Sequence, residues 1–162
     1  MTIQSSCMMQ RRVLLMRHAE SSNDDTSVSD HQRPLHPRGT MDTLRIAHAL
    51  QRLNWIPTQV FVSDSKRTLA TLEGLKTVLG EVATETMDSL YHAPTTTIVE
   101  CLQNANVGGV TLILSHNPGT ELVLYELTGE FHVMTPAACA LLVHQDGEWQ
   151  CQHILRPKEL DE

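Results

Sequence analysis

Residues 13–21, with the sequence VLLMRHAES, join a short apolar run directly to an arginine and a histidine. Apolar runs of this length are typical of buried strands. A strand that ends in Arg17 and His18 delivers both side chains to the mouth of a sheet, where α/β proteins bind their ligands. The stretch therefore predicts a ligand site at the carboxyl end of the first strand.

Two other apolar runs end beside groups that can hold a phosphate. Residues 110–115 lead into His116, and residues 60–62 lead through a short polar stretch to Arg67. Ligands of α/β proteins bind outside the carboxyl ends of the strands. We therefore expect these side chains to lie close to the arginine and histidine that follow the first strand.

The alternation of apolar runs with helical patterns predicts the fold class. Strands are expected at about 12–17, 59–63, 84–88 and 110–115, with helices over 40–53, after Ser65, after Pro94 and over 117–129. Two further runs, 139–145 and 148–155, flank Asp146-Gly147, which is a strong hairpin signal. This order predicts an α/β protein, a three-layer αβα sandwich with a mixed, mostly parallel sheet and antiparallel strands at one side.

Local signals place the ends of some helices and the longest loop. The stripe that marks the helix over 40–53 consists of Met41, Leu44, Ala47, Leu50 and Leu53. Asn117 is a good N-cap and Pro118 is favoured at a first helical position, so the last helix is expected to begin there. Residues 20–38 are polar and form a long loop, which in a compact domain is often functional. In that loop Arg33 either helps to close the site or pins the chain.

Length, charge and hydropathy limit the class of protein. The 162 residues suit one domain, in which residues 1–11 form a short N-terminal extension. The net charge of −7 argues against a nucleic-acid partner or an anionic membrane surface, because both need a basic face. No apolar stretch reaches the length of a membrane span, and the N-terminus lacks a secretory signal pattern. We expect a monomer, since no apolar stripe beyond the core pattern is visible.

Cysteine and histidine spacings argue against disulfides and metal sites. The four cysteines, Cys7, Cys101, Cys139 and Cys151, show no CxxC spacing. Cys101 and Cys139 lie in apolar patterns and are expected to be reduced core residues, which indicates a reducing compartment such as the cytoplasm. The nine histidines include no HxxxH or HExxH spacing, so no metal is expected.

The groups at the strand ends suit phosphoryl transfer, which needs in-line attack and compensation of charge on the phosphoryl oxygens. A neutral His18 can attack phosphorus and become a phosphohistidine if one ring nitrogen keeps its lone pair while a backbone carbonyl holds the other. Arg17 and Arg67 would grip the oxygens, and a charged His116 would donate a hydrogen bond. Arg67 lies in the first turn of its helix, where the macrodipole disfavours a cation unless an anion is bound.

In this order the motifs resemble the histidine phosphatase superfamily. Arg17-His18-Ala19 looks like the usual Arg-His-Gly signature of that family, with alanine in place of glycine. The segments similar to its small SixA-like branch, the phosphohistidine phosphatases, are LLMRHAESSNDD, SDHQRPLHPRG, SDSKRTLATLEGL, LYHA, LILSHNPG and LRPKEL. The resemblance implies a phosphoglycerate mutase-like fold, His18 as nucleophile, and a phosphate pocket made of Arg17, Arg67 and His116. It also implies that no metal or organic cofactor is needed.

The proton donor and the substrate are less clearly indicated. Larger members of the family protonate an alkoxide leaving group with a carboxylic acid, and the candidates here are His92, Asp88 and Glu20, or no residue at all. His92 is equally well explained as a substrate-binding residue and as an exposed loop residue. The lack of a strong acid favours a phosphohistidine substrate on a protein over a sugar phosphate, because imidazole is the better leaving group.

The sequence therefore predicts a metal-independent phosphatase that acts through a phosphohistidine intermediate on a phosphorylated protein. Two alternatives stay open. One is a phosphomonoesterase for small phosphorylated substrates. The other is a non-catalytic module that binds phosphate or a phosphoprotein through the same residues.

Overall fold

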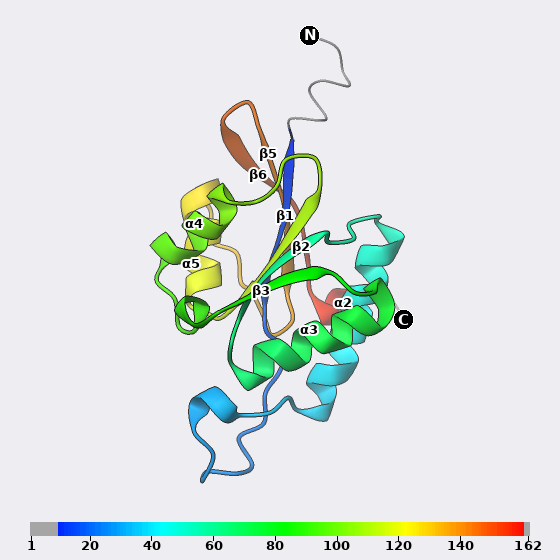
Figure 1. The fold of residues 1–162 in the computed structure, drawn as a ribbon, viewed down its shortest axis with the longest axis vertical. Coiled ribbons are helices and arrows are strands. Elements are labelled where there is room, and N and C mark those ends of the chain that lie inside the picture. The colour runs from blue at the N-terminus through cyan, green and yellow to red at the C-terminus, as the bar shows by residue number, and fades with distance from the viewer. Residues whose placement is uncertain (1–9, 161–162) are drawn as a thin grey trace.

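The computed structural model describes residues 10–160 and arranges them around one six-stranded sheet (Figure 1). The strands are β1 (Arg11–Arg17), β2 (Gln59–Ser63), β3 (Ala83–Met87), β4 (Val110–Ser115), β5 (Cys139–Gln145) and β6 (Glu148–Leu155). The helices are α2 (Pro37–Arg52), α3 (Lys66–Leu79), α4 (Thr95–Gln103) and α5 (Gly119–Thr128), with short 3-10 turns η1 (Asp30–Gln32), η2 (Asp88–Leu90) and η3 (Pro157–Glu159). The strand order is β3-β2-β4-β1-β5-β6.

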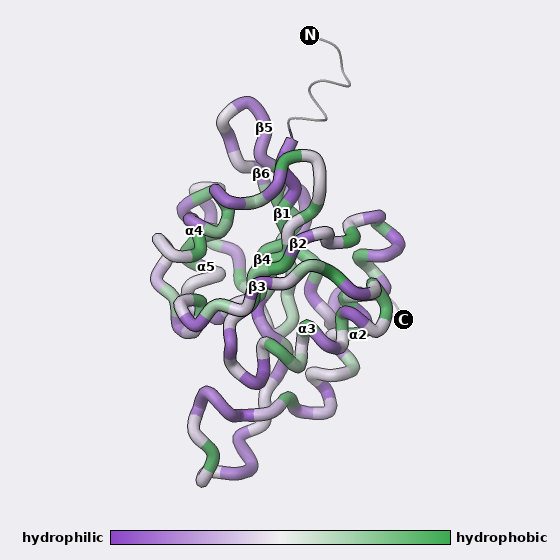
Figure 2. Tube along the Cα trace, viewed as in Figure 1, coloured by the Kyte–Doolittle hydropathy of each residue, from purple (hydrophilic) through white to green (hydrophobic). Residues whose placement is uncertain are grey.

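Helices cover both faces of this sheet, α2 and α3 on one face and α4 and α5 on the other (Figure 1). Successive side chains of a strand point to opposite faces. Leu14 and Met16 of β1 accordingly pack in the core under α2 and α3, while Val13 and Leu15 pack in the core under α4 and α5. Figure 2 shows the hydrophobic segments gathered in the middle of the sheet and mostly hydrophilic residues in the loop that follows β1. The predicted three-layer αβα sandwich is confirmed.

The mixed character of the sheet is confirmed as well. Within the order β3-β2-β4-β1, each strand runs parallel to the next. β5 pairs antiparallel with β1 on one side and with β6 on the other. The hairpin between β5 and β6 turns at Asp146 and Gly147, whose φ angles of 56° and 82° fit the predicted tight turn. β1 begins at Arg11, one residue before the start predicted for the first strand.

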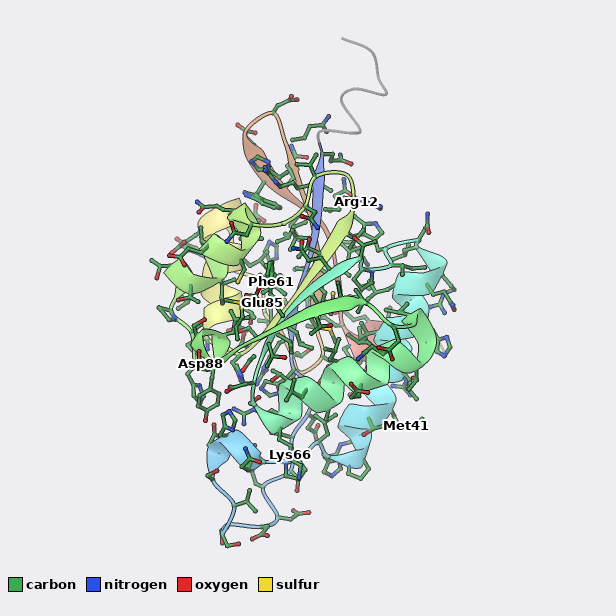
Figure 3. The ribbon with its side chains drawn as sticks, viewed as in Figure 1. Arg12, Met41, Phe61, Lys66, Glu85 and Asp88 are labelled. Atoms are coloured by element: carbon green, nitrogen blue, oxygen red, sulfur yellow. The ribbon has the colours of Figure 1, made fainter. Side chains whose placement is uncertain are left out.

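Helix α2 begins earlier than predicted and faces the sheet with a different stripe. His36 caps it, since its Nδ1 accepts a hydrogen bond from the backbone N–H of Arg38, and the helix starts at Pro37. The buried positions are Gly39, Thr43, Ile46, Ala47, Ala49 and Leu50. Met41 and Leu53, two members of the expected stripe, are 59% and 49% exposed, and Figure 3 shows Met41 on the outer side of the helix. The buried residues follow helical spacing from Gly39, which places Met41 off that face.

The predicted start of the last helix, with Asn117 as N-cap and Pro118 as the first helical residue, is one residue too early. The Asn117–Pro118 peptide bond is cis, and α5 begins at Gly119. The side chain of Asn117 does not cap the helix backbone. Its Nδ2 donates to the carbonyl of Met134 at 3.0 Å, and its Oδ1 accepts from the hydroxyl of Thr120. A Cβ at position 119 would lie 2.9 Å from the carbonyl oxygen of Ala93, so a glycine there lets the first turn of α5 approach that segment.

The cysteines that the structure describes are free thiols, as predicted. Cys101 and Cys139 are buried, and burial raises the pKa of Cys101 to about 11. Cys7 lies outside the described residues. Within residues 10–160 no helix combines the length and the apolar character that a membrane crossing requires.

Candidate active site

The sheet topology brings three strand ends together. β1 and β4 are parallel neighbours in which Arg17 pairs with Ser115, so His18 and His116 follow directly at the same edge. β2 lies on the other side of β4, and its end leads into the first turn of α3, which carries Arg67. The structure therefore brings all four predicted residues into one cluster, and sequence positions almost 100 residues apart become neighbours.

His18 forms the buried floor of this cluster. Its side chain is 7% exposed, and its backbone N–H donates to the carbonyl of Ser115 at 3.1 Å. Nδ1 lies 2.7 Å from the carbonyl oxygen of Ala19, and a carbonyl can only accept, so Nδ1 carries the hydrogen. Nε2 then has the lone pair, as the sequence predicts, and it accepts a bond from Nε of Arg67 at 3.3 Å.

The protonation state of His18 suits a nucleophile. Burial, together with the nearby charges of Arg67 and Arg17, lowers the pKa of His18 to about 4 against the opposing effect of the Ala19 carbonyl. At neutral pH the ring is therefore uncharged. An uncharged imidazole with a free lone pair is the form that can attack phosphorus.

Arg67 lies between the two histidines of the cluster. Its side chain is almost fully buried, with Nε directed at His18 and Nη2 lying 3.4 Å from Nδ1 of His116. Its other contacts are to Asp30, whose backbone carbonyl accepts from Nη1 at 2.6 Å and whose carboxylate accepts from Nη2 at 3.0 Å. The guanidinium thus presents its Nε–Nη2 edge to the histidines and is held at its outer end.

His116 is 2% exposed and lies with its ring centroid 5.2 Å from that of His18. Its Nε2 contacts the hydroxyl of Ser63 at 2.8 Å, and its Nδ1 faces the Arg67 guanidinium, which can only donate. Burial, followed by the neighbouring His18 and Arg67, lowers the pKa of His116 to about 3. The charged ring expected from the sequence is therefore neutral at pH 7 in this structure. An anion bound beside it would favour protonation at Nδ1.

The guanidinium of Arg17 has one nitrogen with a hydrogen-bond partner and one buried nitrogen without one among the described residues. Its Nη1 donates to the carbonyl of Met134 at 3.0 Å, while its Nε is buried and has no hydrogen-bond partner among the described residues. An unsatisfied buried donor on a cation is costly. A phosphoryl oxygen accepting from this nitrogen would remove that cost, and the donor lies one residue from His18.

Asp30 is the residue that the sequence reasoning missed. It lies in η1, and its carboxylate accepts from Arg67, Arg33, the hydroxyl of Tyr91 and Nε2 of His92, the last at 3.0 Å. The hydrogen bond from Tyr91, followed by those from His92, Arg67 and Arg33, holds the pKa of Asp30 far below its ordinary value. Its position inside the family-like segment SDHQRPLHPRG is the one signal that could have drawn attention to it.

Of the three predicted proton donors, the structure places one beside the cluster. The His92 ring lies 5.3 Å from that of His116 and is half-exposed, next to Tyr91. Glu20 is instead bonded to Arg38 on α2, with its Oε2 2.8 Å from Nη2. Asp88 begins η2, and Figure 3 shows it at the end of β3.

The long loop between β1 and α2 is tied down by Arg33. Its guanidinium donates to the backbone carbonyl of Ser22 at 3.2 Å, to the hydroxyl of Ser21 and to Asp30 at 2.9 Å. Of the two interpretations left open for Arg33, the structure shows the pinning contacts. The backbone of Gly39 also packs closely against the backbone of Glu20, which fixes the end of the loop. A Cβ at position 39 would lie 2.3 Å from the Glu20 carbonyl oxygen.

Acid should destabilise the fold through His18. The unfolded ring titrates near 6.5 and the folded ring near 4, so between these values the unfolded chain binds more protons. The free energy of unfolding therefore falls as the pH drops from about 6.5 toward 4, and this ring accounts for roughly 2 kcal/mol at pH 5.

Urea unfolding at pH 7 and pH 5 should show a smaller loss of unfolding free energy for His18→Asn than for the unmodified protein. His48→Asn, at an exposed position on α2, should keep the full loss. An equal loss in all three proteins would contradict the assignment.

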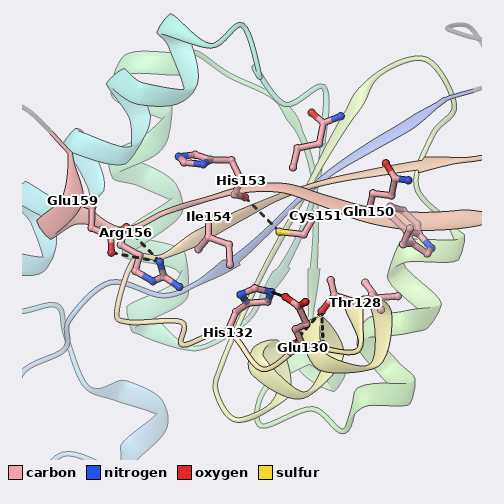
Figure 4. A pocket seen from close by; sticks show the side chains of 12 residues that line it. Thr128, Glu130, His132, Gln150, Cys151, His153, Ile154, Arg156 and Glu159 are labelled. Carbon is pink, nitrogen blue, oxygen red and sulfur yellow. Dashed lines mark hydrogen bonds and ion pairs between the residues drawn. The ribbon is translucent and has the colours of Figure 1, made fainter.

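A separate groove of about 660 Å³ opens between the end of α5 and β6 (Figure 4). In Figure 4, His132 and Glu130 lie across from Cys151 and His153. None of the four predicted site residues lines it. Within the part of the chain that the structure describes, no group of three histidine, cysteine or acidic side chains is placed to hold a metal ion.

The fold and the cluster together define a class: an αβα protein with two arginines and two neutral histidines at the carboxyl edge of a parallel sheet. Residues 13–92 match the sequence model of the histidine phosphatase superfamily, branch 1. An uncharacterised chloroplast protein of Arabidopsis thaliana is 32% identical over 151 residues, which cover 86% of this chain and 69% of that protein.

Solved structures agree with this class at the level of the fold. The SixA protein histidine phosphatase complexed with tungstate has a TM-score of 0.80 and 24% identity, covering 91% of this chain and 97% of that one. A proposed SixA phosphohistidine phosphatase of Agrobacterium tumefaciens has a TM-score of 0.81 and 23% identity, covering 90% and 97%. The chain belongs to the histidine phosphatase superfamily, and its class of activity is that of a phosphatase.

Proposed function

We propose that this phosphatase transfers the phosphoryl group of its substrate to Nε2 of His18 and then releases it to water. The observation that carries the proposal is the neutral, buried His18 ring, which is fixed by the Ala19 carbonyl and faces Arg67 with its lone pair. In the first step Nε2 bonds to phosphorus while the bond to the leaving group breaks. In the second step water attacks the phosphohistidine, and inorganic phosphate leaves.

The other three residues would stabilise the charge that develops on the phosphoryl oxygens in both steps. Arg67 offers the Nε–Nη2 edge of its guanidinium, and Arg17 offers a buried nitrogen that has no partner among the described residues. Nδ1 of His116 faces the same space and, once protonated, would donate a third bond. Prepositioned donors of this kind supply a large share of the rate acceleration in such reactions.

For the substrate we propose a phosphohistidine on a protein. A phosphate ester needs an acid to protonate its alkoxide, and Asp30, a carboxyl group bonded to Arg67 in the cluster, is ionised. A phosphorylated imidazole whose second nitrogen is protonated makes no such demand, since imidazole then leaves as a neutral base. His92 is proposed as a substrate-binding residue at the rim, because it lies next to His116 and is half-exposed. The buried free thiols Cys101 and Cys139 fit a reducing compartment, for which we propose the cytoplasm.

Turnover of a matched set of substrates tests the proposal. The protein should hydrolyse a phosphohistidine peptide and phosphoramidate faster than a sugar phosphate, and a chelator should not change the rates. Rapid quenching should trap an acid-labile phosphoryl group on His18. Faster hydrolysis of the sugar phosphate would favour a small-molecule phosphomonoesterase. Phosphate binding without turnover would favour a non-catalytic module, and inhibition by the chelator would require a metal.

A further inference from the structure

We propose that Asp30 is a specificity-determining residue whose carboxylate selects substrates with a cationic leaving nitrogen over substrates with an anionic leaving oxygen. The inference rests on the proposed function, since it assumes in-line transfer to His18. It assigns to a single side chain the preference for phosphorus–nitrogen bonds.

Asp30 bonds to residues at the exposed rim of the cluster. The centroid of the His116 ring lies 5.2 Å from that of His18 and 5.3 Å from those of Tyr91 and His92. Asp30 bonds to both of the latter residues and is partly exposed, whereas His18 is buried. With His18 beneath the phosphorus, in-line geometry puts the leaving group opposite the ring, toward the exposed rim that contains Asp30.

The carboxylate of Asp30 does not obstruct the phosphate pocket. It bonds to the outer end of the Arg67 guanidinium, through Nη2 from its side chain and Nη1 from its backbone carbonyl. Nε of Arg67 stays directed at His18. Nη2 carries two hydrogens, so one can bond to the carboxylate while the other faces inward together with Nε–H. The phosphoryl oxygens can therefore be held on the inner edge while the carboxylate faces the rim.

Asp30 is also unsuited to donate a proton. The hydrogen bond from Tyr91 and the bonds from His92, Arg67 and Arg33 hold the pKa of its carboxyl group far below the ordinary value. A group that is ionised throughout the neutral range accepts hydrogen bonds only. At the rim it therefore attracts a cation and repels an anion.

The chemistry of the two substrate classes differs at this point. In a phosphorylated imidazole whose second nitrogen is protonated, the ring is cationic, and its N–H can donate to Asp30. When Nε2 of His18 bonds to phosphorus, the P–N bond breaks, its electron pair stays on the departing nitrogen, and the ring leaves as neutral imidazole with the N–H proton it already had. A departing phenolate or alkoxide carries a negative charge toward the same carboxylate. The carboxylate thus favours the first reaction and opposes the second.

The test compares Asp30→Asn with the unmodified protein on phosphoramidate and on p-nitrophenyl phosphate. Phosphoramidate releases neutral ammonia from its protonated nitrogen, whereas p-nitrophenyl phosphate releases p-nitrophenolate, an anion that needs no proton. Loss of a hydrogen bond to a charged group should lower kcat/KM for phosphoramidate by about 10-fold to 100-fold. The value for p-nitrophenyl phosphate should stay constant or rise.

Asp64→Asn is the matched control, because Asp64 also anchors η1, through His31 at 2.8 Å, without contacting the cluster. It should leave the ratio of the two kcat/KM values unchanged. If Asp30→Asn lowers both substrates equally, Asp30 only supports Arg67 and the inference is wrong, although the proposed function stands. If the unmodified protein does not hydrolyse phosphoramidate, the proposed function itself is wrong. Circular dichroism melting of both variants checks that they are folded, and Asp30→Ala repeats the comparison if the asparagine variant is not.

Discussion

Replacing His18 with asparagine should reduce turnover of phosphoramidate by about 10⁴-fold or more and leave the protein folded. Removal of a covalent nucleophile eliminates the bond-forming step, whereas binding and charge stabilisation survive. The asparagine fills most of the space of the buried imidazole, and its side chain can still bond to nearby backbone. The measurement is kcat with purified protein, together with the melting temperature and the yield of trapped phosphoenzyme.

The same experiment separates a nucleophile from a structural histidine. His153→Asn, on the exposed edge strand β6, should keep full activity. The His18 variant should still bind vanadate or phosphate, because Arg17 and Arg67 remain. Residual turnover within tenfold of the unmodified protein would contradict covalent catalysis by His18.

Replacing Arg67 with lysine should lower kcat/KM by about 10²-fold to 10³-fold, the range expected when one preorganised donor to a developing oxyanion is lost. Arg67 contacts His18 through Nε, His116 and the Asp30 carboxylate through Nη2, and the Asp30 carbonyl through Nη1. A lysine ammonium cannot reproduce the directions of these bonds from one planar group. The positive charge is kept, so a large loss would show that geometry matters beyond charge. Steady-state rates on phosphoramidate give the measurement.

Arg38→Lys is the control for this substitution. Arg38 is exposed and bonds to Glu20 on the outer side of α2, so its replacement should change kcat/KM less than twofold. A lysine at position 67 that retains more than one third of the activity would show that the fork of the guanidinium is unimportant.

The cluster could be predicted because it depends on strand order and strand ends. The apolar runs before Arg17 and before His116 are buried parallel strands, and the carboxyl ends of parallel strands meet at one edge of the sheet. Arg67 follows from the same pattern, since only two residues separate β2 from its helix, which is capped by Ser65. Periodicity identifies such elements because burial on both faces constrains every residue of a central strand.

The role of Asp30 and the contacts of Asn117 could not be predicted, because they depend on tertiary contacts that no local sequence pattern encodes. Asp30 meets Arg67, Tyr91 and His92 through the path of an irregular loop, which the sequence shows only as polar residues. Asn117 matched the statistics of an N-cap, yet its side chain bonds to Met134, far along the chain. Tertiary partners decided both positions, and propensity scales contain no information about them.

The loop between β1 and α2 approaches the cluster through Asp30, while the histidines follow strands at the heart of the sheet. These two parts of the pocket belong to different elements of the fold. Changes among residues 22–36 could alter which leaving groups are accepted without disturbing the strand register that aligns the reacting ring. Divergence of substrate range within such a scaffold is therefore expected to accumulate first in that loop, long before the strand ends change.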